Sequence, residues 1–165
     1  MKRANVVDNL SIMMMAKRED VENAALMFIS KADDINVTGR DGRTLLIHSS
    51  LYNYPNLVKT LIEHKADINI QDNKGYSPLH AAVMNRNRQI VEMLLENGAD
   101  PNLIDQNGNN PSFYVGDNTD ILKLLLHYKC NVHNKNIYGI SSFELLMMNP
   151  SMKEILNSLH QQKPE

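Results

Sequence analysis

Between positions 75 and 98 the apolar residues form two short stripes separated by a polar break, Asn85-Arg86-Asn87. The first stripe consists of Leu79, Ala82 and Val83, and the second consists of Ile90, Val91, Leu94 and Leu95. Within each stripe the spacing is that of one face of an α-helix. We therefore predict two short amphipathic helices, joined by a tight turn, that each bury one side.

The residues that flank the two stripes are typical of helix ends. Ser77 can cap the start of the first helix, and Pro78 fixes the backbone angle that the first helical position needs. Gly98 suits the left-handed backbone conformation of the residue that ends many helices. The polar residues from Gly98 to the next glycine predict a hairpin-like loop with an exposed tip. The stretch is thus predicted to form one helix–turn–helix unit followed by a loop.

This pattern recurs along the chain. Gly42, Gly75 and Gly108 are 33 residues apart, and Gly139 follows after 31. The apolar stripe of the second helix and the polar loop return at the same period. Neither helix of one unit has enough apolar area to be stable alone, so neighbouring units are expected to stack and complete a shared core.

Three phrases carry the repeat. They are Ser-Pro-Leu-His-Ala-Ala at 77–82, Ile-Val-Glu-Met-Leu-Leu at 90–95 and Gly-Ala-Asp-Pro-Asn at 98–102. At a period of 33 residues they resemble the ankyrin repeat. The resemblance covers roughly residues 5–160. It implies an all-α solenoid of paired antiparallel helices joined by β-hairpin-like loops.

We expect one domain, residues 1–165, with five repeats. Their approximate bounds are 5–37, 39–71, 72–104, 105–135 and 136–160. The terminal repeats match the phrases least well, as expected for capping units that face water on one side. In the first repeat we place helices near Val6–Ala16 and Val21–Ser30.

The fourth repeat departs from the pattern. Val115-Gly116 replaces the alanine pair, and two residues are missing before Ile121. We expect Gly116 to lie inside a short helix, where glycine costs about 1 kcal/mol relative to alanine. Either this repeat has drifted or its shape is adapted to a partner; drift is the interpretation we favour.

The charge and cysteine content narrow the functional classes. Seventeen Lys and Arg residues stand against 19 Asp and Glu residues, so the net charge is −2. Binders of nucleic acid or of membrane surfaces need a basic excess, and we expect neither here. No apolar run is long enough for a membrane span or an export signal. Cys130 is the single cysteine, and a reducing compartment, the cytoplasm, is the expected location.

Candidate chemical groups fit structural roles better than catalytic ones. His127, Cys130 and His133 have metal-ligand residue types, but the repeat places Cys130 in an alanine slot and offers no fourth ligand. The Asp105-Gln106-Asn107-Gly108 stretch lacks the other ligands of a calcium loop. The resemblance implies that His80 stabilises loops, and we expect His48 to be exposed. We therefore predict no cofactor, no metal and no enzymatic activity.

The resemblance also implies a partner-binding surface, the concave side formed by the loop tips and the first helices. Carried over by register, the candidate residues are Arg40, Arg43, Tyr52, Tyr54, Asn73, Lys74, Tyr76, Met84, Asn85, Arg86, Gln106, Asn107, Asn109, Asp117 and Tyr138. Tyrosine and arginine are favoured in protein interfaces, although tyrosine also tolerates half-exposed turns. The basic members suggest an acidic element on the partner.

We predict a non-catalytic module that binds a partner protein stoichiometrically and is monomeric when unbound. The chain is similar to single-domain ankyrin inhibitors and to small ankyrin proteins that neutralise toxins as immunity partners. Ten methionines and the absence of tryptophan are typical of an AT-rich genome and so indicate a bacterial or viral source. A bacterial source favours the second comparison, with immunity partners of toxins. The alternative is an adaptor or a self-assembling scaffold module.

Overall fold

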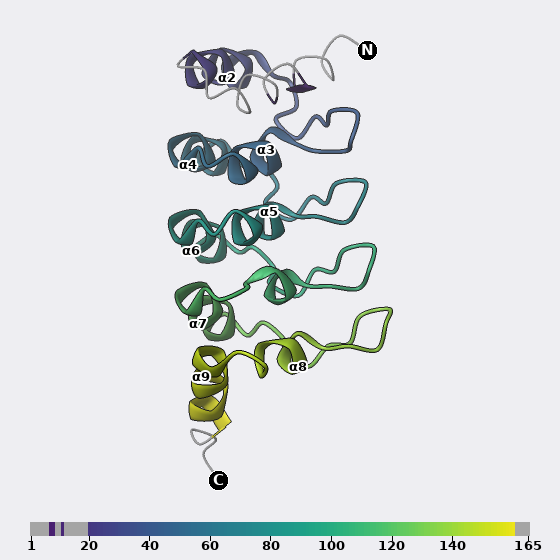
Figure 1. Cartoon of the computed structure of the whole chain (residues 1–165). Helices are drawn as coiled ribbons and strands as arrows, with labels where there is room; N and C mark the ends of the chain where they lie inside the picture. The colour runs from purple at the N-terminus through teal and green to yellow at the C-terminus, as the bar shows by residue number, and fades with distance from the viewer. Residues whose placement is uncertain (1–6, 9–10, 12–19, 161–165) are drawn as a thin grey trace.

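The computed structural model describes residues 7–8, 11 and 20–160 as a stack of helix pairs (Figure 1). The longer helices in one column are α2 (Val21–Lys31), α4 (Pro55–Glu63), α6 (Arg88–Glu96), α7 (Thr119–His127) and α9 (Pro150–His160). The shorter helices beside them are α3 (Leu45–Leu51), α5 (Pro78–Met84), the 3₁₀ helix η1 (Pro111–Tyr114) and α8 (Ser142–Leu146). The loops project from the side of the shorter helices.

The predicted all-α solenoid is confirmed. Among the described residues the extended pairing is limited to one isolated bridge, between Lys135 and Ser141. Within the first predicted repeat, α2 covers the expected Val21–Ser30 helix and one further residue. The expected helix near Val6–Ala16 lies mostly outside the described residues. In the described part of the chain the loops turn back on themselves as hairpins do, but they form no strands.

The core lies between successive helix pairs. α3 packs on α5 and α5 on η1, while α4 packs on α6 and α6 on α7. Both predicted stripes are buried, and Leu79, Ile90 and Leu94 have no exposed surface. Side chains from neighbouring units share each layer, so stacking supplies the apolar contacts that a single unit lacks.

Side-chain caps set the helix starts. Thr44 Oγ1 accepts a hydrogen bond from the backbone N–H of Ile47, and Ser77 Oγ accepts one from His80. The second helices have caps that the sequence analysis missed: Asn87 accepts from Ile90, and Asn118 accepts from Ile121. Asparagine is a strong capping residue. The polar break between the helices is therefore part of the second helix's start.

The closing phrase of each repeat joins consecutive units through asparagine. Asn36 Oδ1 accepts from the N–H of Asp67 (2.8 Å), and Asn69 Oδ1 accepts from Asp100 (2.9 Å). Between the next two units, Asn102 Oδ1 accepts a hydrogen bond from the N–H of Asn131 (2.7 Å). These loop amides have no secondary-structure partner, so the asparagine side chains satisfy them.

The fourth repeat corrects one expectation. Gly116 is not inside a helix, because η1 ends at Tyr114 and Gly116 lies in the turn before α7 with φ +61°. Asn53 and Arg86 have φ values of +64° and +57° in the corresponding turns. The two-residue deletion therefore shortens the first helix to a 3₁₀ turn, and the left-handed residue lies two positions before the cap of the second helix instead of one.

Replacing Gly116 by alanine tests this placement. Alanine would stabilise a helix interior, but at positive φ it costs about 1 kcal/mol. Its Cβ would also meet the Arg86 guanidinium at 3.0 Å. We expect Gly116→Ala to lower the free energy of unfolding, measured by urea titration with circular dichroism. A gain in stability would place the glycine in a helix after all.

Replacing Leu94 by alanine tests the shared core. Leu94 is fully buried between stacked units, and leucine-to-alanine substitutions at such sites cost about 2–5 kcal/mol. Leu26, which is 44% exposed in α2, is the matched control, and Leu26→Ala should change stability by less than about 0.5 kcal/mol. Equal losses in the two variants, measured by urea unfolding, would contradict this core.

Candidate partner-binding surface

Four loop tips, residues 39–43, 72–76, 105–109 and 136–140, share one geometry. In each tip the first residue's N–H donates to the fifth residue's C=O at 2.9 Å. The fourth residue is a glycine with φ between +74° and +82°. Positive φ is accessible to glycine without steric cost. The recurrent glycine is therefore required for the turn, and the residues on either side are free to vary.

Buried carboxylates organise the two central tips. Asp72 Oδ1 accepts hydrogen bonds from the N–H groups of Lys74 and Tyr76, each at 2.9 Å. Asp105 Oδ1 does the same for Asn107 and Asn109, at 2.8 and 3.0 Å. Aspartate commonly accepts such bonds from the backbone two residues on. The stretch that resembles part of a calcium loop is thus a turn motif.

His80 links two units, as the resemblance implied. Its Nδ1 accepts from the N–H of Ser77 (3.2 Å), which closes a capping box at the start of α5. Its Nε2 lies 3.2 Å from the carbonyl oxygen of Asn109 in the following tip. Because Nδ1 is an acceptor, Nε2 carries the proton and donates. His80 therefore holds a helix start and the next tip in one arrangement.

The tips and the shorter helices α3, α5, η1 and α8 form one side of the stack, which we call the inner surface (Figure 1). It contains a hollow of about 30 Å³ between α3, α5 and the tip before α5. The lining residues are Arg43, Ile47, Leu51, Tyr76, Ala81 and Met84. Three of them, Arg43, Tyr76 and Met84, were predicted as partner-binding residues.

The comparison with protein families identifies the chain. A model of three ankyrin-repeat copies matches residues 12–105, more than half of the sequence. This chain is a member of the ankyrin-repeat family. No curated protein matches it. The matched range ends at Asp105, where the irregular fourth repeat begins.

Ankyrin repeats are protein–protein interaction modules, and the family is generally non-catalytic. In the described part of this ankyrin-repeat protein no helix has the length and hydropathy needed to cross a bilayer. A protein–protein interaction takes place on a surface, and the inner surface is the candidate.

The arginines of the inner surface are paired with carboxylates of the same chain. Arg43 Nε lies 3.0 Å from Asp72 Oδ2 and 3.2 Å from Asp41 Oδ2. Arg86 in the turn between α5 and α6 forms an exposed ion pair of 2.7 Å with Asp117 of the next unit. Intramolecular pairing reduces the net positive field of this region. It weakens the expectation of an acidic partner element.

The tyrosines divide into two groups. Tyr52 stacks on His48 with the rings nearly parallel, and Tyr54 is half-buried against the core. Tyr76 packs edge-on against Tyr114 at a centroid distance of 5.8 Å. Tyr138, in contrast, is 70% exposed. Structural packing thus accounts for Tyr52, Tyr54 and Tyr76 at least in part, and only Tyr138 presents most of its ring to solvent.

The polar candidates in the tips are surface residues with mostly local bonds. Asn73 Nδ2 donates to the Arg40 carbonyl (3.2 Å), and Asn109 Nδ2 donates to the Tyr114 hydroxyl (3.3 Å). Lys74 and Gln106 have exposed side chains, and Asn107 is half-buried. Asn85, which lies at the end of α5 and not in a tip, is also exposed. The structure therefore brings the candidates onto one side of the stack while using some of them to fix the tips.

Two apolar residues of the last repeat were missed. Leu145 and Met148 are 44% and 80% exposed, and the repeat register aligns them with Ala81 and Met84. Together with Tyr138 and Ile140 they make the C-terminal part of the inner surface apolar. The register that selected Met84 would have found Met148, had it been extended into the degenerate fifth repeat.

His48 corrects another expectation, because it is buried and not exposed. Its Nδ1 lies 3.0 Å from Ser11 Oγ, while its Nε2 has no hydrogen-bond partner among the described residues. It stands one position later in the repeat than His80, so its ring turns towards the first repeat rather than the next tip.

His127, Cys130 and His133 are engaged separately. Cys130 is buried, its thiol donates to the carbonyl of Pro101 (3.3 Å), and burial raises its pKa to about 11. His127 packs against Tyr128, and His133 packs against Phe143. Among the described residues no three His, Cys, Asp or Glu side chains gather as a metal site would require. A thiol with a raised pKa is also a poor nucleophile.

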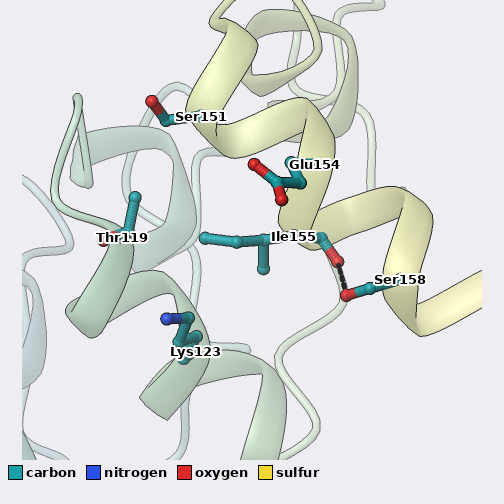
Figure 2. Close-up of a pocket in the computed structure, with 6 residues that line it drawn as sticks. All are labelled: Thr119, Lys123, Ser151, Glu154, Ile155 and Ser158. Carbon is teal, nitrogen blue, oxygen red and sulfur yellow. Dashed lines mark hydrogen bonds between the residues drawn. The ribbon is translucent and has the colours of Figure 1, made fainter.

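An open groove of about 310 Å³ lies between α7 and α9 (Figure 2). Its lining residues are Thr119, Lys123, Ser151, Glu154, Ile155 and Ser158. The figure shows Lys123 on α7 and Glu154 on the facing side of α9. It lies on the helix column opposite the tips, and none of the predicted binding residues lines it.

Burial lowers the pKa of both His80 and His48 below the ordinary value of 6.5. For His80 this effect outweighs the hydrogen bond to Asn109 and the nearby Asp105, which both raise the pKa. The unfolded chain therefore binds protons at a higher pH than the folded chain does. As the pH falls below 6.5, the folded state loses stability until the folded pKa values are reached.

Lowering the pH from about 7.5 to about 5.5 should therefore reduce the free energy of unfolding. We expect His80→Gln and His48→Gln each to show a smaller reduction than the unmodified protein, because one neutral buried imidazole is removed. His127→Gln, at an exposed position, is the control and should behave like the unmodified protein. Urea titrations at both pH values measure these differences, and identical pH responses in all four proteins would rule the explanation out.

Proposed function

We propose that this ankyrin-repeat protein is a stoichiometric binder that holds a partner protein on its inner surface and thereby blocks the partner's activity. The observation that supports this most directly is the hollow in which Arg43, Tyr76 and Met84 meet. Met84 is 42% exposed there, so an apolar side chain of a partner would gain buried area by covering it.

The proposed contact residues extend along the stack. They are Arg40, Arg43, Tyr52, Tyr54, Asn73, Lys74, Tyr76, Met84, Asn85, Arg86, Gln106, Asn107, Asn109, Asp117 and Tyr138. To these we add Leu145 and Met148, which are exposed in the same register. We further propose that the five repeats, over residues 1–165, act as one domain, since each described unit packs on the next.

A blocking role is proposed because the buried histidines and the buried cysteine all serve packing or loop geometry. An inhibitor, for example an immunity-type protein that neutralises a toxin or another enzyme, needs only a rigid surface. Its single cysteine is compatible with a reducing compartment such as the cytoplasm. In this role the protein is monomeric until it meets its partner.

The alternative is an adaptor or a self-assembling scaffold module. The apolar C-terminal part of the inner surface, with Leu145 and Met148 exposed, favours it, because exposed apolar area promotes association. Light scattering of the purified protein over a range of concentrations distinguishes the two proposals. A constant monomer mass supports the binder, and a mass that rises with concentration supports the scaffold.

Substituting Met84 by aspartate tests the binding surface. The tagged protein and its Met84→Asp variant would each be used to capture proteins from the cells that produce it, with quantification by mass spectrometry. A charge in the hollow should reduce capture of the specific partner at least about tenfold, since about 1.4 kcal/mol changes a binding constant by that factor.

The matched control is Met27→Asp, because Met27 is exposed on α2 in the opposite helix column. It introduces the same charge on another face and should leave capture unchanged. Both variants should retain the free energy of unfolding of the unmodified protein within about 0.5 kcal/mol. Equal capture by the Met84 variant and the unmodified protein would refute this surface.

A further inference from the structure

The tips are joined to one another by a ladder of backbone hydrogen bonds. In each step the second residue of a tip donates its N–H to the third residue of the tip before it. These bonds run from Asn73 to Asp41 (3.0 Å), from Gln106 to Lys74 (2.9 Å) and from Ile137 to Asn107 (2.9 Å). By this register the next acceptor is the carbonyl of Tyr138, and no described residue donates to it.

The glycines show that the last tip has an open face. A Cβ added to Gly42 or Gly75 would meet the following tip at 2.4 and 2.7 Å, and one added to Gly108 would meet it at 3.1 Å. A Cβ added to Gly139 would meet nothing within 4 Å. In the three earlier tips the following tip covers the glycine. In the last tip no described residue covers Gly139.

The residues around this open face are apolar. Ile137 and Tyr138 are 64% and 70% exposed, and Ile140 is also exposed. The solvent-facing end of a repeat stack is usually polar, because it must remain soluble. The last tip therefore combines an unfilled backbone acceptor, a glycine with free space and exposed apolar side chains.

The first tip, at the other end, is closed by a side chain. Its ladder donor, the N–H of Arg40, donates to Asp8 Oδ1 at 3.1 Å. A Cβ added to Gly39 would meet the same oxygen at 2.3 Å. Asp8 thus occupies the place of a preceding tip. Among the described residues a second copy of the chain therefore has no free donor at the first tip to extend the ladder head to tail.

A tail-to-tail pair of copies is disfavoured as well. The N–H of Asn136 closes the turn of the last tip, and the other four N–H groups of this tip also donate within the chain. Ile137 donates to Asn107, and Tyr138, Gly139 and Ile140 donate to Asn136. The open face therefore offers a backbone acceptor and no backbone donor, so two such faces cannot be joined through the ladder.

We infer that the open face of the last tip, residues 137–140, binds a hairpin tip of a partner protein that has a free backbone N–H, in the way that each following tip binds the tip before it within the stack. That N–H would donate to the Tyr138 carbonyl, and apolar side chains beside it would pack on Ile137 and Tyr138. This surface is separate from the hollow around Met84.

The chain itself supplies a probe with this chemistry. Residues 132–143 form a hairpin whose ends are joined by the bond from Phe143 N–H to the Val132 carbonyl (2.9 Å). In a backbone-cyclised peptide of this segment Asn107 is absent, so the Ile137 N–H is free to donate. The peptide's own amide spectrum verifies its turn before use.

The peptide would be titrated into the full-length ¹⁵N-labelled protein, followed by amide chemical shifts. We expect saturable shifts at residues 137–140 and their neighbours. A peptide methylated at the Ile137 nitrogen lacks the donor and should bind at least about tenfold more weakly. Tyr138→Asp in the protein should reduce binding similarly, whereas Met84→Asp should not.

Three outcomes would overturn the inference. The first is the absence of shifts from the correctly folded hairpin peptide, and the second is equal binding of the methylated peptide, which would indicate apolar adhesion only. The third is a protein mass that doubles with concentration and returns to the monomer in Tyr138→Asp, which would make a second copy the occupant.

Discussion

Every part of this structure depends on the burial of one unit's apolar face by its neighbours. Helices of seven to nine residues, such as α5 and α6, are too short to be stable by themselves in water. They persist because Leu79 and Leu94 are covered completely by side chains of adjacent units. The same dependence makes the two ends of the described stack special, since each has a described neighbouring unit on one side only.

The loops obey a second constraint, that backbone groups without a helical partner must still be satisfied. Short polar side chains do this repeatedly: Asp72 and Asp105 inside the tips, and Asn69 and Asn102 between the closing phrases. These residues are engaged in holding the loops. The variable positions beside the tip glycines are left to present side chains to a partner.

The two proposed binding surfaces follow from these constraints in different ways. The inner surface is a consequence of the repeat, because each unit presents a tip and a short helix on the same side. The open face of the last tip is a consequence of the ends. Asp8 replaces a missing neighbour at the first tip, but no described residue does so for the Tyr138 carbonyl.

Much of the fold was predictable because its signals are local and repeated. The helix stripes, the Ser77 and Thr44 caps and the left-handed Gly98, with φ +90°, all lie within a few residues of the features that they determine. The period then determined how the units stack. His80 was interpreted correctly because the resemblance to the ankyrin repeat implied a loop-stabilising role at this position.

The sequence by itself thus determined the helix pairs and the family, and it predicted the side of the stack that we propose as the partner-binding side. Only the tertiary structure decided how each candidate side chain is used, because contacts between units join residues about 30 positions apart. It buried His48 against Ser11, paired Arg43 with Asp72 and Arg86 with Asp117, and left Tyr138 exposed. It also placed Gly116 in a turn, because η1, which packs against α5 and α8, ends at Tyr114.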